Sequence, residues 1–361
     1  MHLASVSSKL LLALVVLPWP AIAQVEPLRV GAILILSGLG AEQGQNSLRG
    51  ALMAQRRINE SGGINGRTLE IIFEDELGPN PKGAVSAYKK LTTMDGVKYI
   101  IGPQWLNEVQ AVEPLAVKDG VFLLLPSTCS PRLAPSSFCL WAEPVSEMEE
   151  FARYVFARHR TVVTFGSSEP WETLTLRSFE DAYRRLGGQV LRSLWIDEAS
   201  GDVKTEALLT KQAAPEAVFS SALIHFAQYR KELARQRFAA PYYSVELFQE
   251  LINAAGPASE GVTYITPTLP GEAFREAFRA VFNQEPDVPS AQAYDAVMML
   301  AEALRANGEG LDSVKRWFSG FGEYEGASGV IRTVHGKAVV PTGIYQVQGG
   351  RSVRLDAPAE G

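Results

Sequence analysis

The chain has 361 residues, of which 46% are hydrophobic, and its formal net charge at pH 7 is −6. A chain of this length exceeds what one hydrophobic core usually serves, so the composition favours two domains. The mildly acidic balance argues against nucleic acid as a partner.

The first 23 residues have the pattern of a cleaved secretory signal. Lys9 precedes an apolar run at 10–17, and the small residues Ala21 and Ala23 stand where a signal peptidase cuts. Gln24 is then the mature N-terminus. An uncleaved N-terminal anchor is the alternative, but the run is too short to span a bilayer. We therefore expect an exported protein with no stable membrane insertion after cleavage.

The rest of the chain alternates short β-branched apolar runs with longer segments of helical period. Near-continuous apolar strands are typical of parallel sheets that are covered on both faces. Strands are predicted at 29–36, 69–74, 97–101, 121–125, 161–165, 190–196, 217–223 and 261–266. Helices are predicted at 47–60, 82–93, 108–118, 147–158, 173–186, 226–237, 247–255, 272–282, 290–306 and 311–318. Ligands of such sheets bind beyond the carboxyl ends of the strands.

Two breaks divide this alternation into blocks. The sequence WAEP at 141–144 ends the first block of about four units, and TPTLP at 266–270 ends the second. The remaining tail is mostly helical, with short strands near 329–333 and 343–347. Since this tail has no sheet of its own, we expect it to return to the earlier blocks.

The only two cysteines, Cys129 and Cys139, lie in the stretch LPSTCSPRLAPSSFC at 125–139. Export to an oxidising compartment favours a disulfide between them. A catalytic thiol at Cys129 would need an imidazole partner, and no histidine stands at metal-ligand spacing near either cysteine. We expect no catalytic site, no metal site and no cofactor.

A glycine-rich turn follows the first predicted strand, with Gly38, Gly40 and Gly44 in the pattern G-x-G-x-x-x-G. This spacing is one residue longer than the dinucleotide-binding fingerprint. The turn is interpreted as lining some other ligand.

Several stretches taken together resemble the type I periplasmic binding proteins of ABC importers, in particular the leucine/isoleucine/valine-binding group. The most specific is INESGGINGR at 58–67. The others, which follow in the order of that family, are VGA and LSG at 30–38, RGALMA at 49–54, VKYIIG at 97–102, LPST at 125–128, AYDAV at 293–297 and AEAL at 301–304.

The resemblance implies an α/β fold of two doubly wound parallel-sheet lobes joined by a three-strand hinge. Residues 24–143 and 268–330 would form lobe 1, and residues 144–267 and 331–361 would form lobe 2. It also implies a periplasmic protein that captures a small organic ligand between the lobes and delivers it to the membrane permease of an ABC importer. Reporting the ligand to a membrane receptor or regulatory partner is the alternative function.

The resemblance further places the family's ligand contacts on particular residues. Relatives that bind α-amino acids tend to hold the carboxylate with a serine at the place of Leu106 and a threonine at the place of Cys129. An acid at the place of Glu246 pairs with the ammonium. The departures make the cleft more apolar, so the ligand is expected to be amino acid-like or a more apolar small metabolite. The expected contacts are Gln43, Trp105, Leu106, Ser127, Thr128, Cys129, Trp171, Leu223 and Glu246.

Overall fold

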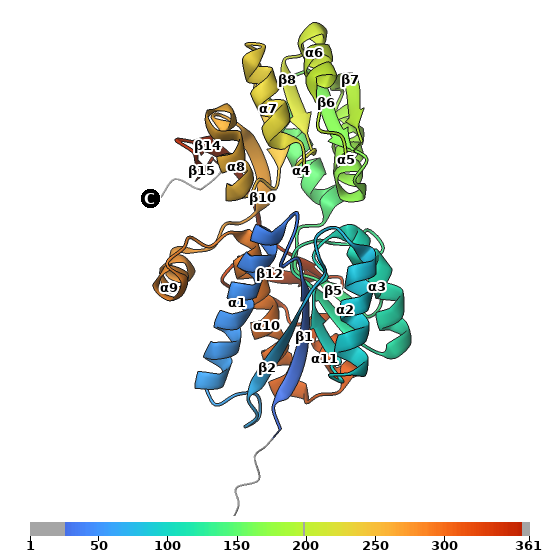
Figure 1. The fold of residues 1–361 in the computed structure, drawn as a ribbon, viewed down its shortest axis with the longest axis vertical. Coiled ribbons are helices and arrows are strands. Elements are labelled where there is room, and N and C mark those ends of the chain that lie inside the picture. The colour runs from blue at the N-terminus through green and yellow to red at the C-terminus, as the bar shows by residue number, and fades with distance from the viewer. Residues whose placement is uncertain (1–25, 198, 356–361) are drawn as a thin grey trace, which may run out of the picture.

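The structure, a computed structural model, describes residues 26–197 and 199–355. Figure 1 shows two lobes stacked along the long axis of the molecule, each with a sheet between helices. The predicted signal segment lies outside the described residues. Among the described residues, no helix has both the length and the apolar character needed to cross a membrane.

The first lobe is built on a parallel sheet of five strands. Leu34 packs on one face with α1 (Ala41–Glu60) and α10 (Val288–Asn307), whereas Ile33 packs on the other with α2 and α3. This division follows from the alternation of side chains along a strand. In order, the strands are β2 (Leu69–Asp75), β1 (Leu28–Leu34), β3 (Tyr99–Ile101), β4 (Phe122–Leu125) and β5 (Ser137–Cys139), and the two other helices are α2 (Pro81–Thr93) and α3 (Leu106–Asp119).

The second lobe is built on a sheet of seven strands, in which the two strand pairings at one edge are antiparallel and the others are parallel. In sheet order these are β15 (Arg351–Arg354), β14 (Thr342–Gln348), β10 (Thr263–Pro267), β9 (Tyr242–Val245), β8 (Ala217–Ser220), β6 (Thr161–Ser167) and β7 (Gln189–Ile196). One face carries α4 (Pro144–Phe156) and α5 (Pro170–Arg185), and the other carries α6 (Lys204–Ala213), α7 (Phe226–Arg235), α8 (Gln249–Ala255) and the short 3-10 helix η1 (Gly256–Ser259).

The chain crosses between the lobes three times, at 140–143, 268–271 and 340–341. The second and third crossings touch, because the backbone N–H of Thr268 donates to the carbonyl of Pro341 at 2.8 Å. Between them the chain returns to the first lobe as α9 (Glu272–Phe282), α10, α11 (Leu311–Phe318) and a small sheet of β11 (Glu323–Gly326), β12 (Gly329–Val334) and β13 (Lys337–Val339).

The predicted fold class is therefore confirmed, and each predicted strand and helix overlaps an observed one. The prediction missed α6 and the strands β5, β9, β11, β13 and β15, most of which have only three or four residues. The lobe division stays a prediction, with one correction at its last boundary. Residues 331–340 were assigned to lobe 2, but Ile331 and Val340 lie in the core of the first lobe. The second sheet takes up the chain only at β14, because the third crossing follows Val340.

Helices α1 and α10 come from opposite ends of the chain and pack directly on each other. A Cβ atom on Gly50 would lie only 1.9 Å from the carbonyl oxygen of Ser290. We expect Gly50→Ala to lower the free energy of unfolding by about 1–3 kcal/mol, because the overpacked contact outweighs the better helix propensity of alanine. Urea unfolding of the variant measures this. Gly201→Ala, where a Cβ meets nothing within 4 Å, is the control and should leave stability nearly unchanged.

Candidate functional site

A cavity of about 130 Å³ lies between the two lobes. Its walls are the loops that follow β1, β3 and β4 in the first lobe and β6, β8 and β9 in the second, together with the start of α10. This is the edge at which open parallel sheets bind ligands, because their strands all end there. The sequence-based expectation of a site beyond the carboxyl ends of the strands matches this placement.

Eight of the nine predicted contact residues line this cavity. They come from both lobes: Gln43, Trp105, Leu106, Ser127, Thr128, Trp171, Leu223 and Glu246. Cys129 is the exception, because its sulfur turns away into a bridge with Cys139. The role of these residues in ligand binding stays a prediction.

The two tryptophans give the cavity aromatic walls from opposite lobes. The indole N–H of Trp105 donates to Oε1 of Gln43 at 2.8 Å, which fixes the orientation of this ring. Gly40 lies against the ring: it has a φ of 85°, and a Cβ atom there would lie 2.8 Å from Cζ2 of Trp105. Gly40 of the glycine-rich turn therefore lines the cavity, and only glycine allows the ring this close.

Gln104, which sequence reasoning missed, lines the cavity on the side of the first lobe and links two of its segments by hydrogen bonds. Its Oε1 accepts from the backbone N–H of Ile35 at 2.7 Å, and its Nε2 donates to Ser127 at 3.3 Å. Thr128 is buried, yet its hydroxyl has no hydrogen-bond partner among the described residues. A buried hydroxyl without a partner costs stability, so Thr128 offers a ready contact for a ligand.

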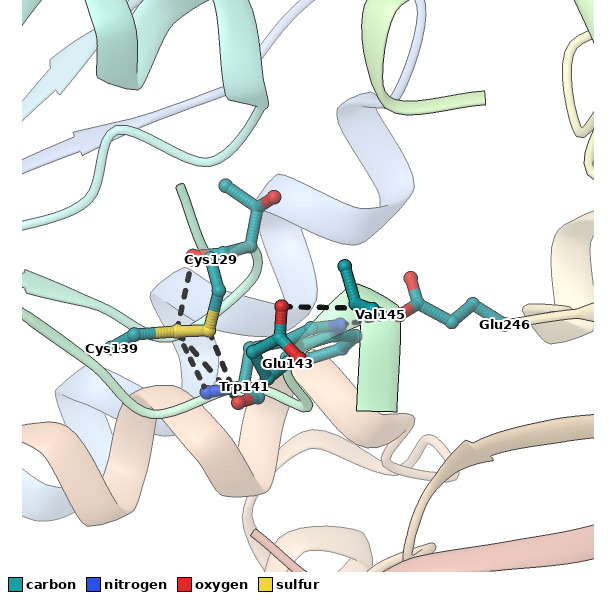
Figure 2. Close-up of a disulfide and its surroundings, with 7 residues drawn as sticks. Cys129, Cys139, Trp141, Glu143, Val145 and Glu246 are labelled. Atoms are coloured by element: carbon teal, nitrogen blue, oxygen red, sulfur yellow. Dashed lines mark hydrogen bonds between the residues drawn. A yellow bond between two sulfur atoms is a disulfide. The ribbon is translucent and has the colours of Figure 1, made fainter. Parts of the chain in front are cut away.

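Cys129 and Cys139 form a disulfide with a Cα separation of 5.5 Å, which confirms the predicted pairing. Figure 2 shows the bridge beside Trp141, whose backbone N–H donates to Sγ of Cys139 at 3.3 Å. Trp141, Cys129 and Cys139 share one buried cluster with Val288 of α10. The bridge therefore anchors the loop after β4 next to the first crossing between the lobes.

Glu246 reaches the cavity from the loop after β9, in the second lobe. The indole N–H of Trp141, on the first crossing, donates to its Oε1 at 2.6 Å (Figure 2). Glu246 has a φ of 47°, an uncommon left-handed conformation for a residue other than glycine. Burial raises the pKa of Glu246 to about 8. The pKa of Glu147 also lies well above its usual range. Burial is the main cause, and the neighbouring carboxyl group of Glu246 is the second.

Further carboxyl groups around the cavity were not predicted from the sequence. Glu172 accepts from the hydroxyl of Ser167 and from the backbone N–H of Ile224 at 3.0 Å, and burial raises its pKa to about 8. The signal that could have found these acids is their position at the start of helices that follow cavity loops. The others that line the cavity are Glu42, Glu169, Glu250 and Asp287.

A family model described as "Periplasmic binding protein" matches residues 27–351. The leucine-, isoleucine-, valine-, threonine- and alanine-binding protein of Pseudomonas aeruginosa is 26% identical over 302 residues, covering 76% of this chain and 77% of that protein. The fold is similar to that of LivJ, the branched-chain amino acid transporter substrate-binding protein of Streptococcus pneumoniae, in complex with isoleucine. The TM-score is 0.83 at 20% identity, over 91% of this chain and 100% of LivJ. A solute-binding protein of an ABC transporter from R. palustris in complex with benzoate gives a TM-score of 0.80 at 19% identity, covering 91% and 95% of the two chains.

The buried carboxyl groups predict that acid stabilises the fold. A carboxyl whose pKa is raised in the folded state favours folding fully below its unfolded value of about 4.5, and this contribution is lost as the pH rises through the folded value. Because Glu246 has a folded pKa of about 8, the free energy of unfolding should fall between about pH 5 and about pH 8, by at most about 1.4 kcal/mol per pH unit for this group. Glu246→Gln keeps an acceptor for Trp141 and should flatten the slope in urea unfolding. An unchanged slope would contradict the assignment, and Glu276→Gln, at an exposed position on α9, is the control.

The disulfide predicts a second stability effect. Closing a loop of ten residues restricts the unfolded chain and should contribute about 2–3 kcal/mol. The double variant Cys129→Ser, Cys139→Ser should lose this amount in urea unfolding. A thiol assay on the unfolded, unreduced protein should find no free thiol, and two free thiols would show that the bridge is absent.

Proposed function

The chain belongs to the periplasmic binding protein family, a family of solute-binding proteins and not of enzymes. From this premise we propose that it is an extracytoplasmic substrate-binding protein that delivers its ligand to the membrane permease of an ABC importer. The ligand is a small organic molecule, either amino acid-like or a more apolar metabolite. The proposal includes cleavage of the N-terminal signal and a periplasmic location.

The observation that carries this proposal is the cavity between the lobes, whose walls combine loops from both sheets. Its volume of about 130 Å³ suits a small ligand, since a protein cavity of about 150 Å³ accommodates benzene. The isoleucine and benzoate bound to the two similar folds are ligands of this size. Their binding supports the proposed ligand class.

A ligand in this cavity would contact both lobes at once. Trp105 belongs to the first lobe and Trp171 to the second, so a molecule between them gains both contacts only when the lobes approach. Ligand would therefore favour the closed arrangement over the open one, with the three crossings as the hinge. The closed form is then the one that the permease engages.

A ligand screen by thermal shift tests the proposal on the mature chain. A ligand at 100 times its Kd adds about 2.7 kcal/mol to the stability of the protein, so a hit should raise the melting temperature clearly. For a hit, we expect Trp171→Ala and Trp105→Ala to weaken binding at least about tenfold, because each removes an aromatic wall.

Trp195→Ala is the matched control, because Trp195 is 38% exposed on β7 and lies outside the cavity. It should leave ligand affinity unchanged. If no small molecule shifts the melting temperature, or if Trp195→Ala weakens binding as much as Trp171→Ala, the proposal fails. If ligand binds but a reconstituted permease takes none up, reporting to a membrane receptor or regulatory partner replaces delivery.

A further inference from the structure

The charged groups around the cavity are all of one sign. Among the described residues, no lysine, arginine or histidine lines it, whereas carboxyl groups line it from both lobes. Burial raises the pKa of Glu42 on α1, and the charges of Glu250 on α8 and Asp287 at the start of α10 raise it further. Arg49 opposes these effects, but its influence is the smallest of the four. The cleft thus brings like charges from both lobes close enough to disfavour one another.

Acidic side chains lie at the N-termini of helices around the cavity in both lobes. Positive helix ends are the usual backbone site for an anion, but in the second lobe acidic side chains already occupy them. Glu169 caps α5 by accepting from the backbone N–H of Glu172 at 2.7 Å. Asp287 accepts from Gln249 at the start of α8, at 3.1 Å, and from Val288 at the start of α10, at 2.8 Å. In the first lobe, α1 and α3 have no side-chain cap, and their first turns carry Glu42 and Glu108.

A carboxylate on the ligand would find few side-chain donors. Leu106 has no polar side-chain atom, and Cys129 is oxidised and turned out of the cavity. The hydroxyl of Thr128 is the buried donor without a partner, and one hydroxyl does not compensate for the desolvation of a carboxylate. An ammonium group, by contrast, can donate to the same hydroxyl oxygen.

The remaining walls suit the body of a small organic cation. Trp105 and Trp171 face the cavity, and tryptophan is the aromatic side chain that attracts a cation most strongly over its face. Leu106, Leu223 and Phe248 complete an apolar lining. Burial holds Glu246 largely uncharged at neutral pH, and a cation beside it would favour its ionised form.

We propose that the ligand is a compact primary amine with an apolar body and no carboxylate, held as a cation between Glu42 of the first lobe and Glu250 of the second. This inference rests on the proposed function and narrows its ligand class. The cation relieves the like-charge contact across the cleft and so favours closure. A zwitterion or an anion brings a negative charge that no lysine, arginine or histidine among the described lining residues would balance.

Isothermal titration of the mature chain with two matched sets of compounds tests the inference. The first set is 3-methylbutylamine, 3-methylbutan-1-ol, 4-methylpentanoate and leucine, and the second is benzylamine, benzyl alcohol and benzoate. In at least one set we expect the amine to bind at least about tenfold more tightly than its alcohol, acid and amino-acid counterparts, a difference of about 1.4 kcal/mol.

Charge-neutralising variants then locate the cation. Glu42 and Glu250 are exposed at the cleft rim, so Glu42→Gln and Glu250→Gln should fold normally, which their melting temperatures check. Each should weaken amine binding about 3- to 10-fold and leave binding of the neutral alcohol unchanged. Glu276→Gln on α9 is the control for an exposed charge outside the cavity and should change neither.

The outcomes separate this inference from the proposed function. If leucine, benzoate or a neutral ligand binds more tightly than the matched amine, the inference is wrong and the proposed function stands. If the amine binds but neither Glu42→Gln nor Glu250→Gln weakens it, the inference is also wrong. If no compound binds here and the wider thermal-shift screen is negative as well, both fail.

Discussion

The hydrogen bond from Trp141 to Glu246 is the contact on which the arrangement of the site depends. It joins the first crossing between the lobes to the loop after β9, and both partners are almost fully buried. The disulfide between Cys129 and Cys139 lies next to this crossing and shares a buried cluster with Trp141 (Figure 2). A buried carboxyl must be partnered or uncharged, and here it is partnered by an indole and largely uncharged. The site and the hinge therefore share one buried group.

Other acids around the cavity have their own hydrogen-bond partners, although no lysine, arginine or histidine among the described residues lines it. Glu172 is satisfied by Ser167 and the backbone of Ile224, and burial keeps it largely protonated at neutral pH. Asp287 is satisfied by two helix N-termini. Among the acids that line the cavity, Glu42 and Glu250 are the two that are exposed, and they lie at its rim. The carboxyl groups available to a ligand thus lie at the rim between the lobes, whereas Glu172 and Asp287 are hydrogen-bonded to other parts of the protein.

The first lobe illustrates a different constraint, since its core joins segments far apart in the chain. Helix α10 reaches it only after the chain has built the second sheet and crossed back. Its fit against α1 needs Gly50, where the backbone of Ser290 leaves no room for a side chain. The two lobes are therefore not two consecutive independent domains, because the core of the first is completed by a segment that follows the second sheet in the chain.

The sequence by itself determined the alternation of strands and helices, the two blocks and the resemblance that located eight cavity residues. These follow from local periodicity and from short motifs, which are properties of neighbouring residues. The sequence did not predict β5 and β9, because runs of three or four residues carry too little pattern. Only the tertiary structure decided that residues 331–340 pack in the first lobe, that Cys129 turns away from the cavity and that Glu42 and Glu250 line the same cavity. Burial and electrostatic interaction depend on which residues meet in space, and these residues are up to about 200 positions apart in the chain.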